Sequence, residues 1–305
     1  MLEKLLHLQK TIHQWFTQDC DDDDDWKNWA YMAPQLYFMQ RGDLFDITFC
    51  GECDEDFNRR PSAELFNEEV SAYPFIAFLE LLSQQEIADQ IISLQFQPPD
   101  EGANGTKQLN FKRLVDSGVT FPNLTQFSVG LTNPTDHNTG IMVAEEPWSF
   151  NENGIIARLV STMPKLRSLT VPSAPDKSFF EIGPLKLTEL IVQAGYDRQN
   201  FIENLAESNN FPDLRFLDYS DYRYVFSHMA GTETPFESYK KLFLSPLFQQ
   251  EHLHVFWLRD SILTNPQLSA IMTIFKEACG ANKRRLLFKH ISSRDKYIEE
   301  NQFQY

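Results

Sequence analysis

One short pattern of apolar positions recurs at six places along the chain. It reads Leu-x-x-Leu-x-apolar, with Ile or Phe in place of Leu in some copies, and three copies follow closely on Phe-Pro or Met-Pro. The six copies occupy 91–96, 124–129, 166–171, 187–192, 214–219 and 253–258. A supersecondary unit that repeats in order is typical of a solenoid, and a solenoid usually offers a binding surface rather than a catalytic pocket.

Segments with the period of an amphipathic helix lie between these copies. Their apolar positions are Phe111, Leu114 and Val115; Ile155, Ile156, Leu159 and Val160; Phe201, Ile202, Leu205 and Ala206; and Leu268, Ile271, Ile274 and Phe275. We therefore expect each copy to form a strand and each of these segments a helix. The longer gaps hold polar insertions, such as 132–149 and 225–238, which we expect to be loops near a binding face.

The part of the chain before the first copy predicts a different α/β arrangement. Apolar spacing indicates helices over 2–16, 75–82 and 84–90 and a strand over 44–50. We expect residues 1–83 to cap a solenoid over 84–290, because an uncapped end would expose the solenoid core. Residues 286–288 predict a last edge strand, and 291–305 a polar C-terminal tail.

The six copies resemble leucine-rich repeats, of the helix-bearing type found in ribonuclease-inhibitor-like proteins. Successive copies begin 21 to 42 residues apart, and the shorter spacings match the leucine-rich period of about 20 to 29 residues. The Asn or Cys that commonly follows the strand in this family is absent after Val129 and Val192. The resemblance implies an α/β fold, with a curved parallel sheet, outer helices, and an inner face that grips another protein.

Alternation along each strand predicts which side chains face away from the core. If the second Leu position of each copy faces the core, its two neighbours face the opposite side. These neighbours are Ser93, Gln95, Gln126, Ser128, Ser168, Thr170, Glu189, Ile191, Phe216, Asp218, Val255 and Trp257. The early pairs are small and polar, whereas Phe216 and Trp257 place aromatic rings where solvent is expected.

Charged and aromatic residues close in sequence to Phe216 and Trp257 complete a candidate partner-binding site. They are Asp218, Asp221, Tyr222, Tyr224, Arg259 and Asp260. Exposed aromatic rings with a charged rim are typical of an interface hot spot. The alternative is that an insertion or the C-terminal tail covers the two rings.

Composition narrows the class of partner. The 305 residues include 43 Asp and Glu against 27 Lys and Arg, which gives a net charge of −16. This charge argues against nucleic acid, whose binding proteins carry a basic surface, and favours a basic protein partner. Basic residues over 283–296, Lys289 among them, are interpreted as balancing local charge or protecting the last edge strand. The 26 Phe residues suit a core shared between stacked units.

Cysteine usage and hydropathy favour a cytoplasmic protein. The four cysteines are too few and too scattered for a disulfide framework. Residues 1–16 lack the unbroken apolar run of a signal peptide. No stretch approaches the about 20 apolar residues that cross a bilayer, so we expect no membrane contact.

Residues with catalytic or metal-binding potential are few. Cys50 and Cys53 form a C-x-x-C, but acidic neighbours would raise the pKa of the thiols, and zinc needs four ligands. His252 and His254 have no third ligand nearby in sequence. The run 21–25 of five Asp lacks the spacing of a calcium loop, and no Gly-rich phosphate loop is present. We expect no enzyme activity, no metal and no cofactor.

These observations predict a non-enzymatic protein that binds another protein. The narrower hypothesis is an acidic inhibitor, such as an immunity protein that neutralises a basic toxin or nuclease, because opposite charge speeds association. The alternative is an adaptor or scaffold, in which residues 1–83 dock to a larger complex and the repeats select a client. An enzyme that uses Cys50 and Cys53 is the least favoured hypothesis.

Overall fold

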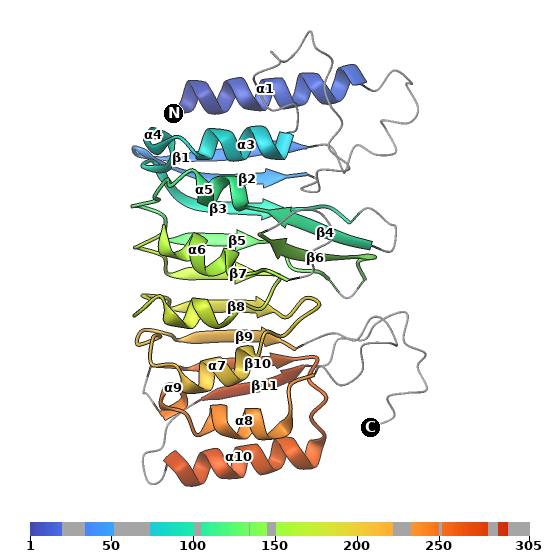
Figure 1. Ribbon diagram of the computed structural model, residues 1–305, viewed down its shortest axis with the longest axis vertical. Coiled ribbons are helices and arrows are strands. Elements are labelled where there is room, and N and C mark those ends of the chain that lie inside the picture. The colour runs from blue at the N-terminus through green and yellow to red at the C-terminus, as the bar shows by residue number, and fades with distance from the viewer. Residues whose placement is uncertain are drawn as a thin grey trace.

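A single long sheet organises the molecule. The computed structural model describes residues 1–19, 34–51, 74–100, 105–133, 135–144, 151–221, 233–249, 252–279 and 286–291. Nine strands of this part form one sheet in the order β1 (Gln35–Arg41), β2 (Leu44–Cys50), β3 (Ile91–Gln97), β5 (Gln126–Val129), β7 (Ser168–Val171), β8 (Glu189–Gln193), β9 (Phe216–Ser220), β10 (Val255–Arg259) and β11 (Leu287–Ile291). Figure 1 shows them stacked one after another along the long axis.

The direction of the strands confirms a largely parallel α/β architecture. Strand β1 runs antiparallel to β2, and every other neighbouring pair in this sheet is parallel. All six strands predicted from the repeated pattern are present, as are the predicted strand over 44–50 and the last edge strand. Parallel neighbours require a crossover between them, and the intervening segments provide it.

Helices lie on one side of this sheet (Figure 1). They are α3 (Pro74–Leu82), α4 (Gln85–Ala88), α5 (Lys112–Asp116), α6 (Ile155–Ser161), the 3-10 helix η2 (Lys177–Glu181), α7 (Phe201–Glu207), α8 (Phe236–Phe243), α9 (Pro246–Gln249) and α10 (Asn265–Cys279). Helix α1 (Leu2–Asp19) packs against the first strand, where Gln9 Nε2 donates to the Leu36 carbonyl at 2.6 Å. The predicted boundary at 83/84 lies between α3 and α4, and β2 before it pairs with β3 after it.

The repeated apolar pattern produces a repeated backbone geometry. The residue just before β8, β9 and β10 donates its N–H to the corresponding carbonyl of the preceding unit: Thr188 to Arg167 at 2.8 Å, Arg215 to Thr188 at 2.9 Å, and His254 to Arg215 at 2.8 Å. The apolar positions of the pattern, such as Leu187, Leu190 and Val192, are buried. Each of these units therefore continues the same row of backbone hydrogen bonds.

The Phe-Pro and Met-Pro pairs form the turn that leads into a strand. Leu166 donates to the Met163 carbonyl at 3.0 Å, and Leu214 donates to the Phe211 carbonyl at 3.4 Å. Proline occupies the second position of each turn, where its fixed φ is favourable. Met163 and Phe211 are buried, so each turn also anchors its own unit in the core.

Aromatic rings join neighbouring units, as their abundance predicted. Phe96 contacts Phe111 with ring centroids 4.9 Å apart, and each of them also contacts Phe127 of the next strand. A second group surrounds Phe256 and Phe243 near the C-terminal end. One hydrophobic core runs through all the units, from α1 to α10.

The prediction that 132–149 is a loop was wrong. Residues Asn138–Val143 form β6, which pairs in parallel with β4 (Gly105–Asn110) in a second, two-stranded sheet. This small sheet lies against the ends of β5, β7 and β8, where Gly140 N donates to Thr132 Oγ1 at 2.8 Å and Met142 N donates to Ser173 Oγ at 2.9 Å. Its pairing joins segments more than 30 residues apart, which local periodicity does not reveal.

Several sequence expectations fall outside the described residues. They are the Asp run at 21–25, most of the insertion at 225–238, and the tail beyond residue 291. The described end of that insertion contains the start of α8 at Phe236. Along the part of the chain that the structure describes, no helix combines the length and apolar character needed to cross a bilayer.

Candidate functional site

The side of the sheet opposite the helices, here the far face, changes character along the molecule. Strand pairing aligns one row of side chains across it, consisting of Thr48, Gln95, Ser128, Thr170, Ile191, Asp218, Trp257 and Lys289. The first four are uncharged polar residues, and the last four combine apolar and charged groups. The aligned row thus changes along the sheet from small polar side chains to a mixture of apolar and charged ones, although Asp218 within it is buried.

Five residues at the C-terminal end of this face form what we name the Trp257 cluster: Phe216, Asp218, Trp257, Arg259 and Lys289. The rings of Phe216 and Trp257 meet edge to face, with centroids 5.1 Å apart. Arg259 donates from Nε and Nη2 to the two carboxylate oxygens of Asp218 at 2.7 and 2.8 Å. These bonds raise the pKa of Arg259, while partial burial opposes the rise. The two-bond pairing fixes the guanidinium beside the aromatic pair.

Two cations contact the indole of Trp257. The Arg259 guanidinium carbon lies 5.2 Å from the ring centroid and Lys289 Nζ lies 5.8 Å from it. Such contacts contribute about 0.5–1 kcal/mol each at exposed sites. The Lys289 side chain is exposed, and no carboxylate of the described residues pairs with it. Within the described part of the chain, the charge of Lys289 is therefore not offset by a carboxylate.

The indole N–H of Trp257 lacks an acceptor. Its Nε1 is buried from solvent, although the residue as a whole is half-buried, and it has no hydrogen-bond partner among the described residues. A buried donor left unpaired costs about 1–3 kcal/mol. Within the described part of the protein, Trp257 therefore holds an unsatisfied buried donor.

The structure brings together some of the predicted partner-binding residues. Phe216, Asp218, Trp257 and Arg259 are in contact, and Asp260 lies in the turn after β10 with φ of 55°. The Asp260 carboxylate accepts a hydrogen bond from Ser220 Oγ at 3.1 Å. The two tyrosines of the predicted site, Tyr222 and Tyr224, lie outside the described residues.

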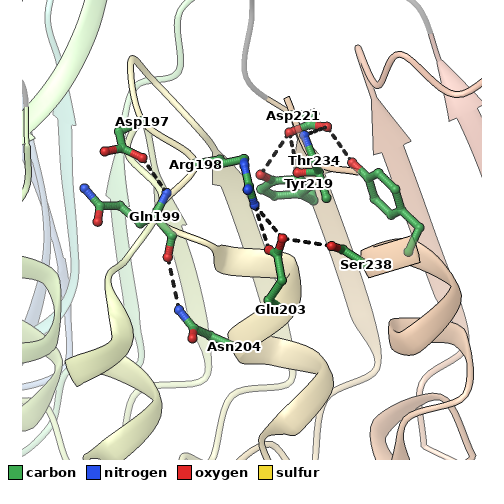
Figure 2. Close-up of polar contacts among 10 residues, drawn as sticks. Asp197, Arg198, Gln199, Glu203, Asn204, Tyr219, Asp221, Thr234 and Ser238 are labelled. Carbon is green, nitrogen blue, oxygen red and sulfur yellow. Dashed lines mark hydrogen bonds and ion pairs between the residues drawn. The ribbon is translucent and has the colours of Figure 1, made fainter. Parts of the chain in front are cut away.

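Asp221 lies apart from the Trp257 cluster, at the end of β9 and buried (Figure 2). Its carboxylate accepts hydrogen bonds from Tyr239 OH at 2.6 Å, from Thr234 Oγ1 at 2.8 Å and from Tyr219 OH at 3.2 Å. Burial and then the charge of Asp221 raise the pKa of both tyrosines well above the ordinary value. The Asp221 carboxylate thus serves to join β9 to α8 within the protein.

A second polar network lies beside the first (Figure 2). Arg198 Nη1 contacts the two Glu203 oxygens at 2.7 and 2.8 Å, and Ser238 Oγ donates to Glu203 Oε1 at 2.8 Å. Glu203 lies on α7 and Ser238 on α8. Together with the Asp221 network, these bonds fix the helices behind strand β9.

Sequence reasoning missed the role of Lys289, which it treated only as part of a basic stretch. Lys289 pairs across the sheet with Trp257, so it extends the same row of side chains. The alternation of Leu287, Phe288 and Lys289 could have revealed this, because it continues the pattern of the earlier strands. Val255 and Leu287 border the cluster in the adjoining row.

The residues considered for redox or metal chemistry do not assemble into a site. Cys50 is a free thiol whose pKa is raised by burial, and its Sγ lies 3.4 Å from Gln97 Oε1. Its partner in the C-x-x-C, residue 53, is outside the described part. Within the described ranges, no group of three or more His, Cys, Asp or Glu residues could hold a metal ion.

Comparison with known proteins does not assign the chain to a family. No protein-family model matches the chain, and none of the curated proteins matches it either.

Proposed function

We propose that this chain is a non-enzymatic solenoid of leucine-rich-repeat type that binds another protein. The successive parallel strands, the repeated N–H to carbonyl bonds between units and the buried Leu positions support the repeat assignment. We place this binding in the cytoplasm, and the free thiol of Cys50 is consistent with a reducing compartment.

The single observation that carries the proposed binding is the composition of the Trp257 cluster. Trp and Arg are the residue types that most often dominate binding energy, and here they contact each other on a sheet face. The Asp218 carboxylate holds Arg259 in one orientation, so little side-chain freedom remains to be lost on binding. Half-buried Ile191 and Val255 extend the apolar area beside the rings.

The net charge of −16 supports a narrower proposal. An acidic protein attracts a basic partner over distances of about 10 Å and accelerates their association. We propose an inhibitor or immunity protein that masks a basic toxin or nuclease by this route. Association should then slow steeply as the salt concentration rises.

Affinity capture from a lysate of the source cells tests the proposed function. The baits are the wild type, Trp257→Ala and a control, Phe236→Ala. Phe236 is also a half-buried ring with a lysine over it, Lys240 Nζ at 5.5 Å, but it lies on helix α8. We expect a specific protein to be retained by the wild type and by the control and lost with Trp257→Ala. Equal retention by all three baits, or retention of no protein, contradicts the proposal.

One observation favours the adaptor as a second candidate. Apolar side chains are exposed at the opposite end of the molecule: Leu2 and Leu6 on α1 at 42% and 47%, and Tyr37 and Met39 on β1 at 52% and 54%. Two separated apolar surfaces suit a protein that contacts two partners. If the protein is an adaptor, Met39→Glu should abolish capture of one protein and preserve capture of the protein that depends on Trp257. If it is an inhibitor, Met39→Glu should capture the same proteins as the wild type.

A further inference from the structure

The Trp257 cluster carries chemical information about the group that binds it. We infer that it accepts a carboxylate adjacent to an apolar side chain, that is, a short segment of a partner protein with Asp or Glu next to a Leu, Ile, Phe or Trp. This inference rests on the proposed function and specifies the contact made at the same surface. Three properties of the cluster support it.

The first property is the unpaired indole N–H. Trp257 Nε1 is buried and has no acceptor in the described part of the protein. An indole nitrogen is a donor only, so the missing group must be an acceptor. Since the atom is shielded from solvent, the ring must turn or its neighbours must shift before a partner can reach it. Binding should therefore change the environment of this N–H.

The second property is the charge that remains after internal pairing. Arg259 offsets Asp218 through two hydrogen bonds, whereas among the described residues the Lys289 ammonium contacts only the ring of Trp257. Guanidinium has five donors, and the pairing with Asp218 occupies two of them. The Lys289 ammonium and the remaining Arg259 donors, both close to the ring, favour an anionic acceptor over a neutral one. A carboxylate satisfies the ammonium and the indole N–H together.

The third property is the apolar border. Val255 and Phe216 pair across β9 and β10, and Leu287 continues this row on β11 with 61% of its surface exposed. Ile191 adjoins Asp218 on the other side. A partner that offered a carboxylate alone would leave this area in water, so an apolar neighbour in the same segment is required for close packing.

This local preference is compatible with a basic partner overall. The net charge of −16 acts at long range and is screened beyond about 10 Å, whereas Lys289 acts on the atoms in contact. A partner that is basic as a whole can present one acidic side chain at the centre of its interface.

Selection from a displayed library of random twelve-residue peptides tests the inference without knowledge of the partner. The baits are the wild type, Lys289→Glu, and Lys276→Glu as control. Lys276 is exposed on α10, so the control makes the same change in net charge far from the cluster. We expect the wild type and the control to enrich Asp or Glu next to an apolar residue. Lys289→Glu should instead enrich Lys or Arg at that place.

A titration followed by NMR locates the contact. A selected peptide is added to protein labelled with ¹⁵N at its tryptophans, and Trp257→Phe identifies the Trp257 indole signal. We expect that signal to shift on binding, and replacement of the acidic residue by its amide to weaken binding about tenfold.

Several results would overturn the inference. They are selection without acidic enrichment, identical selection by Lys289→Glu and Lys276→Glu, failure to select any peptide, or binding that leaves the Trp257 indole signal in place. The proposed function fails separately, when Trp257→Ala captures the same proteins as the wild type. Loss of capture with Trp257→Ala but not with Lys289→Glu refutes the inference alone.

Discussion

Two aspartates, Asp218 on β9 and Asp221 directly after it, show how position decides the role of a side chain. Asp218 and Asp221 are three residues apart, so alternation turns them to opposite sides of the sheet. Asp218 pairs with Arg259 on the far face, whereas Asp221 is enclosed by two tyrosines and a threonine behind it. Proximity in sequence grouped them as one candidate site, but strand geometry separates them.

The Asp221 network predicts a measurable loss of stability. Tyr239→Phe removes the donor that lies 2.6 Å from the buried carboxylate, and leaves the ring in place. We expect a loss of about 1–3 kcal/mol in the free energy of unfolding, measured by urea denaturation.

Tyr37→Phe is the matched control, because Tyr37 is 52% exposed and, among the described residues, its hydroxyl bonds only to the side chain of Gln35 on the same strand. It should change the free energy of unfolding by less than about 0.5 kcal/mol. Equal changes in the free energy of unfolding for the two substitutions would show that the hydrogen bond from Tyr239 to the buried Asp221 carboxylate does not stabilise the protein. Tyr37→Phe should also leave binding of a partner at the Trp257 cluster unchanged, because Tyr37 lies on β1 at the other end of the sheet.

At the level of elements, the regular part of the fold was predictable and the insertions were not. The strands at 91–97, 168–171 and 255–259 follow directly from their apolar pattern, because each buries side chains of its own segment against the next. β4 and β6 form only by pairing with each other, so nothing within either segment specifies a strand. Within the Trp257 cluster, the sequence predicted that Phe216 and Trp257 lie on the far face, because side chains alternate along a strand. The pairing of Arg259 with Asp218 was not predictable, because it depends on the register between β9 and β10.

The attachment of the small sheet predicts a pH-dependent contribution to stability. Asp100, which follows β3, accepts hydrogen bonds from the backbone N–H groups of His137 and Asn138 at 3.0 and 3.2 Å, and contacts His137 Nδ1 at 3.0 Å. Burial alone would raise the pKa of Asp100, but these bonds outweigh it and lower the pKa to about 2.

A carboxyl group with a lowered pKa stabilises the fold above its unfolded pKa, about 4, and this stabilisation disappears as the pH falls toward 2. We expect Asp100→Asn to cost about 1–2 kcal/mol at pH 7, a value reduced by partial solvent exposure. The difference from the wild type should shrink by about half at pH 3. Urea denaturation at the two pH values measures it.

The control for this comparison is Asp213→Asn. Asp213 pairs with Arg167 at 3.2 Å on the surface, where such pairs contribute about 0–1 kcal/mol. A difference for Asp100→Asn that stayed constant between pH 7 and pH 3 would mean that its charge does not hold the small sheet in place.

For the whole molecule, the order of the strands determines how destabilisation spreads. The strands of the main sheet follow one another in sequence order, so each unit touches chiefly the units before and after it. In a solenoid, the architecture proposed above, stability is close to a sum of units and of interfaces between neighbours. The aromatic groups around Phe96 and Phe256 lie in different parts of the core, separated by the strands β7 to β9.

This arrangement predicts that damage stays local. Phe96→Leu and Phe256→Leu are a matched pair, because both rings are fully buried and both lie on strands of the same sheet. Each should cost about 1–2 kcal/mol and raise amide exchange about tenfold in its own neighbourhood. We expect faster exchange in β2–β5 for the first variant and in β9–β11 for the second, as measured by hydrogen exchange with mass spectrometry. Since local opening of the C-terminal units would carry the Trp257 cluster with it, only Phe256→Leu should weaken binding there. Equal acceleration along the whole chain in both variants would mean that the sheet unfolds as one unit, and that neighbour contacts do not limit the spread.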